Sequence, residues 1–225
     1  GYIPHPDIND HIDTFNDKDY IDHDYEAIDE DATNGNPSHG THLAGIIGAI
    51  SNNEGICGIN WNVNLLPIRV MGKNSGETID IIDAIYYAVD HGASVINLSL
   101  AVMDPNINIS LMDDALKYAQ NAGVTTVAAA GNFSQFESKS VLYPANSKYT
   151  IAVGATGPNQ LPAWYSGYGD ELDIWAPGGD MTSSDSNGIL STHRYYDNNS
   201  YDDDYLYMEG TSMATAHVSG VAALL

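Results

Sequence analysis

Apolar residues follow two alternating patterns along this chain. Residues 78–91 and 111–121 carry apolar side chains at the spacing of an amphipathic helix, and a glycine follows each segment as a stop. Other segments are short, mostly apolar and rich in Val, Ile, Leu or Ala, which is typical of strands buried on both faces. These predicted strands cover residues 65–70, 93–100, 124–130 and 150–155. Strands that alternate with helices predict an α/β fold of three layers, α/β/α, around a mostly parallel sheet.

The length of 225 residues suits one α/β domain with a buried core. Residues 193–207, rich in Tyr and Asp, are predicted to form one long surface loop before a last helix. No apolar run reaches the roughly 18–20 residues that cross a bilayer, and the N-terminal residues do not resemble a signal peptide. Because the chain opens at Gly1 and stops within the apolar run 221–225, we expect both ends to be truncated.

The chain is strongly acidic, with 30 Asp and Glu against 7 Lys and Arg and a net charge of −23. Such a charge argues against nucleic acid and anionic membranes as partners. Acidic residues gather in segments 7–31 and 197–204. Three interpretations are open: solvated loops, a surface adapted to salt, or oxygen ligands for calcium. The single cysteine, Cys57, excludes an internal disulfide and is predicted to be a small buried side chain rather than a catalytic thiol.

Three segments place polar side chains at strand ends and helix starts, where parallel α/β folds hold their chemistry. The first is Ser38-His39-Gly40-Thr41-His42, which opens a helix of small side chains. A histidine there can face a cleft, although a lone histidine is more often structural. His39 and His42 could also form a metal pair, but no carboxylate follows at a fixed spacing, which disfavours a metal.

The second segment is an apolar strand that ends in Ala130, Gly131 and Asn132. The Asn132 amide belongs either to an ordinary turn or to a site that stabilises negative charge in a transition state. In the third segment, Gly210 precedes Ser212 at the start of an apolar helix. A serine there is by default an N-cap, but the same position exposes its hydroxyl beside free backbone N–H groups.

Together and in this order, the three segments resemble the subtilisin family (subtilases, the S8 peptidases). The serine motif matches residue for residue, and the histidine motif has Leu43 where the family usually has Val. The matching segments are residues 39–45, 129–132 and 210–214. The resemblance runs over nearly the whole chain, and it implies the subtilisin-like fold and serine endopeptidase activity.

The resemblance also implies a role for each matched residue. Ser212 would be the nucleophile and His39 its general base. Asn132 and the Ser212 backbone N–H would form the oxyanion hole. The small residues after the matched strands would bind the substrate backbone and wall an apolar primary pocket, and Ala101, where the family usually has Gly, would narrow its entrance. These substrate-binding positions are Ser99, Leu100, Ala101, Ala129, Ala130 and Gly131, with Asn74, Ser75 and Gly76 on a facing edge strand.

The triad aspartate of the family has no counterpart in this sequence. In the family this residue is followed by Ser or Thr, then Gly, and a few residues later by His-Pro-Asp, which Gly1 and His5-Pro6-Asp7 match. The aspartate is therefore expected two residues before Gly1. On this alignment residues 1–225 form a single peptidase domain that lacks the N-terminal strand with the aspartate and a C-terminal segment, so we expect the chain alone to be inactive.

A structural calcium ion is a further implication of the resemblance. Segment 50–56 aligns with a family loop whose oxygens surround Ca²⁺ together with an aspartate, and a loop without metal is the alternative. All the implied ligands are hard oxygen donors, as calcium prefers. They are the side chains of Asp7 and Asn52 and the carbonyls of Ile50, Glu54 and Ile56.

The expected protein is thus a secreted, monomeric endopeptidase that acts on proteins or peptides and is made with an N-terminal propeptide. The alternative is a non-catalytic relative, a pseudoprotease or acidic calcium-binding module that kept the fold. Intact His39, Asn132 and Ser212 favour the enzyme, because a binding module has no need of all three. An α/β-hydrolase acting on esters is disfavoured, because the histidine precedes the serine along this chain.

Overall fold

The computed structural model describes residues 1–2, 4–29, 38–72, 76–102, 109–133, 139–197 and 200–225. These residues form two compact units. Unit 1 comprises Gly1–His91 and Ser191–Leu206, and unit 2 comprises Gly92–Leu190 and Tyr207–Leu225.

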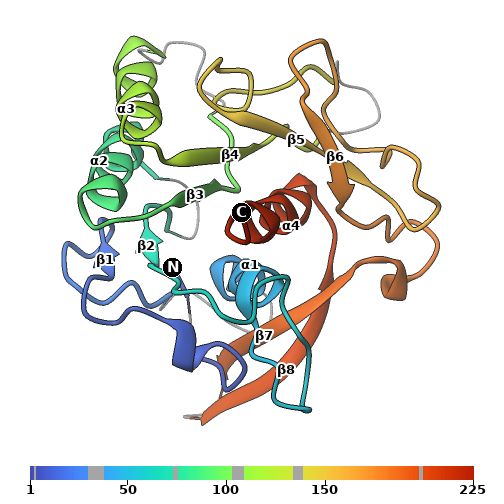
Figure 1. The fold of residues 1–225 in the computed structure, drawn as a ribbon. Coiled ribbons are helices and arrows are strands. Elements are labelled where there is room, and N and C mark those ends of the chain that lie inside the picture. The colour runs from blue at the N-terminus through green and yellow to red at the C-terminus, as the bar shows by residue number, and fades with distance from the viewer. Residues whose placement is uncertain (3, 30–37, 73–75, 103–108, 134–138, 198–199) are drawn as a thin grey trace. The chain divides into compact units, whose positions relative to one another are not determined.

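Unit 2 is built on a parallel sheet with the strand order β3-β4-β5-β6 (Figure 1). Val95 pairs with Thr125 and Leu98 with Ala128, so β3 and β4 run side by side without a slip. The other two neighbouring pairs are also parallel. The strands are β3 (Val95–Leu98), β4 (Thr125–Ala129), β5 (Ile151–Thr156) and β6 (Ile174–Pro177).

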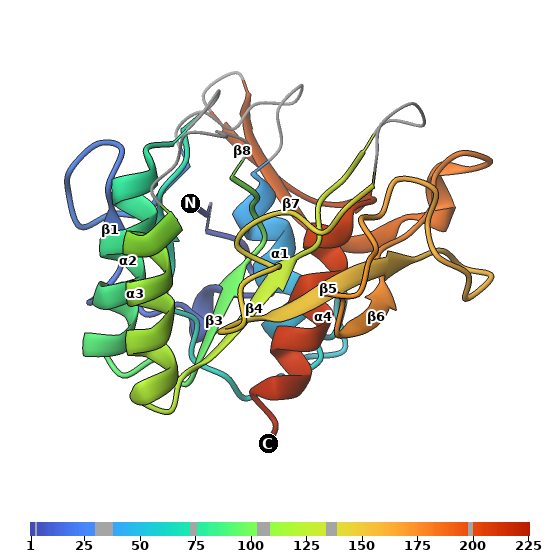
Figure 2. The ribbon, with the colours of Figure 1, turned by 90° about the horizontal axis from the view of Figure 1, so that it is seen from above.

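Two helices of unit 2 cover opposite faces of this sheet. Helix α3 (Ile109–Asn121) packs against β4, and α4 (Thr211–Ala222) packs against all the strands from β3 to β6. Figure 1 has α3 above and α4 below the sheet, and Figure 2 shows β4 between the two helices. Both faces of β4 are therefore covered, which is why this strand is buried along most of its length, whereas most of β6 at the edge of the sheet is exposed.

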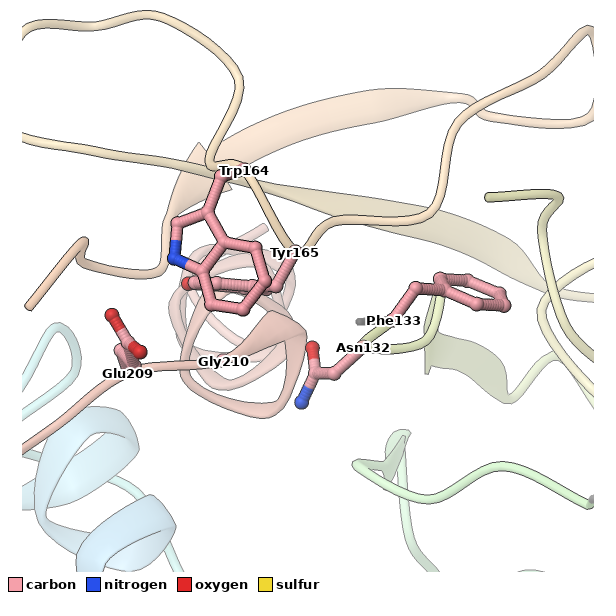
Figure 3. A pocket seen from close by; sticks show the side chains of 6 residues that line it. All are labelled: Asn132, Phe133, Trp164, Tyr165, Glu209 and Gly210. Carbon is pink, nitrogen blue, oxygen red and sulfur yellow. The ribbon is translucent and has the colours of Figure 1, made fainter. Parts of the chain in front are cut away.

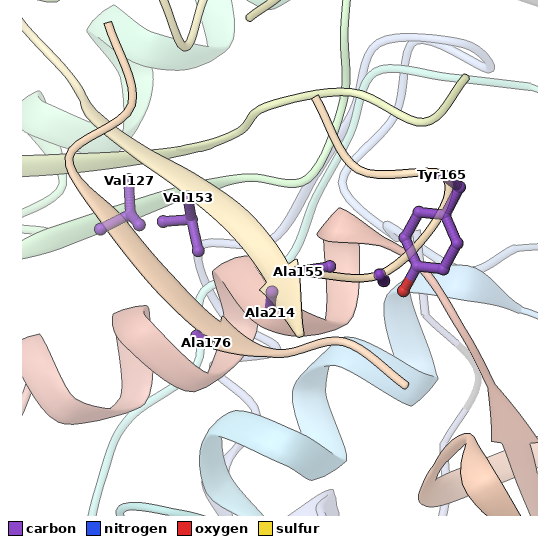
Figure 4. Packing of buried hydrophobic residues seen from close by; sticks show 7 residues of the cluster. Val127, Val153, Ala155, Tyr165, Ala176 and Ala214 are labelled. Carbon is purple, nitrogen blue, oxygen red and sulfur yellow. The ribbon is translucent and has the colours of Figure 1, made fainter. Parts of the chain in front are cut away.

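The core of unit 2 is made of small and branched side chains between the sheet and α4 (Figure 4). Ala214 on α4 faces Ala155 and Ala176 of the sheet, and such short side chains let the helix approach the strands closely. Tyr165 brings a polar group into this core, and its hydroxyl lies 2.9 and 2.8 Å from the carbonyl oxygens of Gly178 and Gly179. The buried cluster is Val127, Val153, Ala155, Ala163, Tyr165, Ala176 and Ala214.

Unit 1 contains α1 (His39–Gly48), α2 (Thr78–Asp90), the 3₁₀ helix η1 (Asn9–His11) and the parallel pair β1 (Lys18–Asp19) and β2 (Ile68–Arg69). Helix α1 begins after Ser38, whose Oγ accepts the Thr41 N–H at 3.4 Å. Arg69 is 1% exposed, and its Nη1 pairs with Asp19 at 2.9 Å and Asp22 at 2.6 Å. Part of the acidic segment 7–31 is therefore internal rather than solvated.

The segment expected to be a long surface loop is a two-stranded sheet, so that prediction was wrong. Its strands are β7 (Ile189–Asp197) and β8 (Ser200–Met208). On β7, the Ser191 hydroxyl donates to the His42 carbonyl and the Thr192 hydroxyl to the Thr41 carbonyl, each at 2.7 Å. A side chain at Gly45 would collide with the same two hydroxyls, so β7 lies directly on α1.

Other predictions were also inexact. Cys57 is exposed rather than buried, because it lies in the loop after α1 and not on a helix or strand. The strand predicted at 65–70 is reduced to β2, and the structure has β6, which was not predicted. Among the described residues, no helix has the length and apolar character needed to cross a membrane.

Candidate active site

Ser212 lies in the first turn of α4, after the N-cap Gly210. Gly210 has a φ of 152°, a conformation that side chains rarely adopt, and a Cβ there would lie 3.1 Å from the Asn132 amide nitrogen. N–H groups in a first helical turn have no carbonyl partner within the helix. The turn therefore offers a hydroxyl and a backbone N–H of one residue to the same ligand.

The Asn132 side chain is fixed against this turn by its oxygen. Its Oδ1 accepts hydrogen bonds from the Thr211 backbone N–H and from the Thr211 hydroxyl, both at 2.9 Å. A backbone N–H can only donate, so Oδ1 must face Thr211 and the Nδ2 donor must point elsewhere. Asn132 is exposed, and Figure 3 shows its amide oxygen and nitrogen pointing in different directions beside the chain that carries Gly210.

Ser212 is also tied to the end of β3. The Ser99 hydroxyl donates to the Ser212 carbonyl at 2.9 Å, and the Ser212 hydroxyl donates to the Ser99 carbonyl at 3.4 Å. The second bond is long, so the Ser212 proton can be given up to a better acceptor. Asn97 supports the arrangement, since its Nδ2 donates to Ser99 Oγ at 3.0 Å and its Oδ1 accepts from the Ser219 hydroxyl at 2.8 Å.

The predicted substrate-binding residues of unit 2 lie at the carboxyl ends of β3 and β4. Ser99, Leu100 and Ala101 follow β3, whereas Ala129 ends β4 and Ala130 and Gly131 follow it. The Gly131 N–H lies 3.3 Å from the Thr211 hydroxyl oxygen, which connects this segment to the start of α4. Gly76 belongs to unit 1, and Asn74 and Ser75 lie outside the described residues.

His39 lies in unit 1 as the first residue of α1. Burial, and to a lesser degree the positive charge of the Gly1 amino group, lower the pKa of His39 from 6.5 to about 4. The ring is therefore neutral at pH 7, as a general base must be. Gly1 lies against this end of α1, because a side chain at Gly40 would collide with the Gly1 carbonyl.

His42 has a different environment from His39. It is 1% exposed, and its Nε2 lies 2.9 Å from the Leu206 carbonyl oxygen. This contact ties α1 to β8 and gives His42 a structural role. The described part of the chain contains no group of three or more His, Cys, Asp or Glu side chains that could hold a metal.

The residues expected to bind calcium gather around Asp7 in unit 1. The Asp7 side chain is 2% exposed, and its Oδ2 accepts the Ile56 N–H at 3.1 Å and the Tyr205 hydroxyl at 2.8 Å. The Asp7 carbonyl accepts the Ile50 N–H at 2.8 Å. Both ends of the segment 50–56 are therefore held at Asp7.

Asn52 and Glu54 lie in the same loop, and Asn52 Oδ1 accepts the Glu54 N–H at 2.9 Å. The set has only one carboxylate, with an amide oxygen and backbone carbonyls for the rest. These hard oxygen donors around a buried carboxylate fit calcium, with the Tyr205 hydroxyl as a competitor for Asp7.

A comparison with models of protein families matches residues 2–225 to the Subtilase family. This chain belongs to the subtilase family. Similar proteins include a thermophilic serine proteinase from Bacillus sp. (strain AK1), 40% identical over 223 residues, and thermitase from Thermoactinomyces vulgaris, 39% identical over 205 residues. These matches cover 98% and 89% of this subtilase, which spans only 48% and 66% of the two relatives' own lengths.

Solved structures are similar to this subtilase as well. A protease from Pseudoalteromonas arctica PAMC 21717 has a TM-score of 0.86 and 35% identity, covering 100% of this chain and 74% of that one. A lanthipeptide protease has a TM-score of 0.78 and 27% identity, covering 98% of this chain and 68% of that one. The predicted subtilisin-like α/β/α fold is thereby confirmed.

The sequence did not reveal which residues orient the site of this subtilase. Thr211 was visible only as the middle of the serine motif, and nothing in the sequence assigned it the Asn132 oxygen. Trp164, Tyr165 and Glu209 border a pocket beside Asn132 and were also missed. The available signals were the aromatic pair at 164–165 and a carboxylate directly before Gly210.

Proposed function

We propose that the protein containing this chain is a serine endopeptidase, with Ser212 as nucleophile and His39 as general base. The observation that supports this most directly is the orientation of Asn132. Its oxygen is held by Thr211 while its nitrogen remains a donor beside the first turn of α4. Two donors next to a serine hydroxyl are what an acyl-transfer site needs.

In the proposed reaction, Ser212 Oγ attacks the carbonyl carbon of the peptide bond and its proton passes to His39. His39 gives this proton to the leaving amine, and the acyl group remains on Ser212 as an ester. Water then attacks the ester while His39 takes its proton, and the serine is regenerated. In both steps the carbonyl oxygen becomes negative and accepts hydrogen bonds from Asn132 Nδ2 and the Ser212 N–H.

The third member of the triad is proposed to be an aspartate two residues before Gly1, as the motif alignment implies. The position of Gly1 supports this proposal, because Gly1 lies against Gly40, the neighbour of His39. Residues directly upstream would therefore begin beside the histidine. An aspartate there would fix the tautomer of the ring and stabilise its protonated form.

We also propose that the protein binds calcium through Asp7 and the loop 50–56, and that it is secreted as a monomer with a propeptide. The oxygen set around Asp7 supports the calcium site. The greater length of the matched relatives leaves room for a propeptide. Substrates are proposed to be proteins or peptides with a large uncharged side chain before the cleaved bond.

The activity is tested on the full-length protein with a fluorophosphonate probe and a peptide substrate. Ser212→Ala and His39→Ala are each expected to remove nearly all turnover, and the double variant should lose little more. This non-additivity is known for subtilisin, where the serine and the histidine act as one unit. The control is Ser186→Ala, which removes an exposed hydroxyl elsewhere in unit 2. Full turnover in Ser212→Ala would show that Ser212 is not the nucleophile, whereas no turnover together with no labelling of Ser212 would identify a non-catalytic module.

A further inference from the structure

A pocket of about 280 Å³ lies beside Asn132 and takes no part in the proposed steps (Figure 3). This volume is close to the roughly 300 Å³ at which pockets begin to hold small ligands. All of its lining belongs to unit 2. The lining residues are Asn132, Phe133, Trp164, Tyr165, Glu209 and Gly210.

Glu209 gives this pocket its charge. Among the residues that the structure describes, it is the only Asp or Glu in the lining, and none of those that line the pocket is Lys or Arg. The Met181 backbone N–H donates to Glu209 Oε2 at 2.5 Å and so fixes the carboxylate, whose other oxygen has no hydrogen bond from the described part of the chain. A fixed carboxylate costs a ligand less ordering of the site than a mobile surface side chain would.

Aromatic rings form the other walls. Trp164 is 40% exposed and meets Tyr165 edge to face, with ring centroids 5.8 Å apart. The Tyr165 hydroxyl is turned to the carbonyls of Gly178 and Gly179, so this residue contributes a buried ring rather than a polar group. Figure 3 shows the Trp164 indole and the Glu209 carboxylate on the same side of Asn132, with Phe133 pointing to the other.

A carboxylate beside an exposed indole is suited to a cationic side chain with an apolar stem. The stem can lie along the rings, while the charged end meets Glu209 and the indole face. A cation already lies near this indole, since Lys139 Nζ donates to the Trp164 carbonyl oxygen and lies 5.9 Å from the ring centroid. Asp180 adds to the negative potential, because Glu209 and Asp180 both help burial to raise the pKa of Tyr165.

The residues that line this pocket indicate which substrate residue it would hold, when they are compared with the residues of the primary pocket. Asn132 belongs to both regions, so the new pocket begins next to the reacting carbonyl. Ala129, Ala130 and Gly131, which are predicted to wall the primary pocket, do not line it. Phe133, whose ring would add an apolar rim to the primary pocket, does line it but points to the other side of Asn132 from Glu209. A peptide bond has two sides, and the primary pocket is assigned to the acyl side, which leaves the amine side for the pocket at Glu209.

We propose that this pocket binds a lysine or arginine side chain of the substrate, contributed by the residue directly after the cleaved bond. This assignment rests on the proposed endopeptidase function and adds its preference on the leaving-group side. Glu209 is a specificity-determining residue, and Trp164 supplies the second contact to the cation.

The test uses the full-length protein and peptides that differ only in the residue after the cleaved bond, which is Lys, Arg, Gln or Glu. We expect kcat/KM to be roughly three- to tenfold higher for Lys and Arg than for Gln, with Glu lowest, as partly exposed charge and cation–π contacts suggest. Glu209→Gln keeps an acceptor for the Met181 N–H and should make kcat/KM for the Lys and Gln peptides equal. Glu209→Lys should invert the order of Lys and Glu, and Trp164→Ala should reduce the ratio. Glu171→Gln, an exposed charge outside the pocket, is the matched control and should preserve it.

A second measurement needs no turnover. Product-like peptides that begin with Lys or Glu are titrated into the Ser212→Ala protein by calorimetry, with and without Glu209→Gln. Tighter binding of the Lys peptide, lost in Glu209→Gln, supports the pocket even if no peptide is hydrolysed, an outcome that would refute the endopeptidase function alone. Hydrolysis with equal kcat/KM for Lys and Glu, or equal binding of the two peptides, overturns the pocket assignment.

Discussion

Asn132 shows how one side chain can be fixed at its acceptor so that its donor is available. The Thr211 N–H and hydroxyl both bind Oδ1, which makes Thr211 a positioning residue for the amide. Loss of the Nδ2 donor should therefore affect activity differently from loss of the hydrogen bonds by which Thr211 holds the Asn132 side chain. The two effects can be separated because Asp and Asn have the same shape but only Asn has an N–H donor.

Asn132→Ala is expected to lower kcat with little change in KM, because the amide stabilises charge that exists only in the transition state. The loss known for the equivalent side chain in subtilisin is about 10²–10³-fold, and we expect the same here. Asn132→Asp keeps an acceptor for Thr211 but lacks the donor, so it should lose as much. Steady-state kinetics on peptides measure both effects. A raised KM with normal kcat would mean that Asn132 only binds substrate.

His39 should make the free energy of unfolding depend on pH. Its pKa of about 4 in the folded chain lies below the ordinary 6.5, so between these values the unfolded chain binds more protons. The stability that this residue contributes is therefore complete above about pH 6.5 and falls as the pH falls toward about 4. Urea unfolding of the chain and of His39→Asn over this range measures the difference, with a smaller slope expected for the variant.

The same group tests the proposed upstream aspartate. Burial also lowers the pKa of His217, so the comparison follows the His39 ring itself by NMR. A carboxylate beside His39 favours the protonated ring, so its pKa should be higher in a longer protein that contains the aspartate than in the same protein with asparagine at that position, since both lack the amino group at Gly1. An equal pKa in these two proteins would contradict the aspartate's proposed position.

At the scale of elements, the sequence predicted a helix most accurately where apolar residues recur at helical spacing within one segment. Helix α2 was predicted within one residue, because Ile81, Ile82 and Ile85 share a face that is buried. Strand β7 was taken for a loop because Asp and Asn, which are depleted in strands, are frequent in this stretch, and because its contacts with α1 lie far away in the sequence. The sequence singled out His39, Asn132 and Ser212 by their motifs, and their roles stay predictions, whereas the contacts of Thr211, Trp164 and Glu209 could not be read from sequence spacing.

The loop 50–56 should link calcium to stability. A ligand that binds only the folded state adds RT ln(1 + [L]/Kd), about 2.7 kcal/mol at 100 times Kd. A chelator is therefore expected to lower the melting temperature, and Asp7→Asn should remove this response while Asp10→Asn, on an exposed residue, keeps it. Tyr205→Phe removes the competing hydroxyl donor, so it should cost about 1 kcal/mol without calcium and retain the response. A melting temperature that ignores the chelator in every variant would exclude the site.

For the whole molecule, a net charge of −23 means that its acidic groups repel one another. Internal pairs such as Arg69 with Asp19 offset little of this, because they use few of the 30 carboxylates.

Simple salt should therefore raise the melting temperature, since the Debye length falls from about 30 Å at 0.01 M to about 3 Å at 1 M. NaCl and KCl are expected to act equally, whereas calcium should act at millimolar concentrations, where screening is small. Differential scanning calorimetry with chelator present separates the two effects. A melting temperature independent of NaCl would show that the surface charges are already well dispersed.

The hydrogen bonds between α1 and β7 also determine when unit 1 can be completed. The Thr192 hydroxyl contacts a carbonyl 151 positions earlier, and Tyr205 reaches Asp7 across 198 positions. During synthesis, the helix that carries His39 must therefore wait for residues 191–206 before it is covered. Contacts of such long range make folding slow, and the partly made chain is exposed to aggregation meanwhile. Residues 1–91, which are made before unit 2, are thus among the last to be covered, and a folding aid would be most useful while they wait.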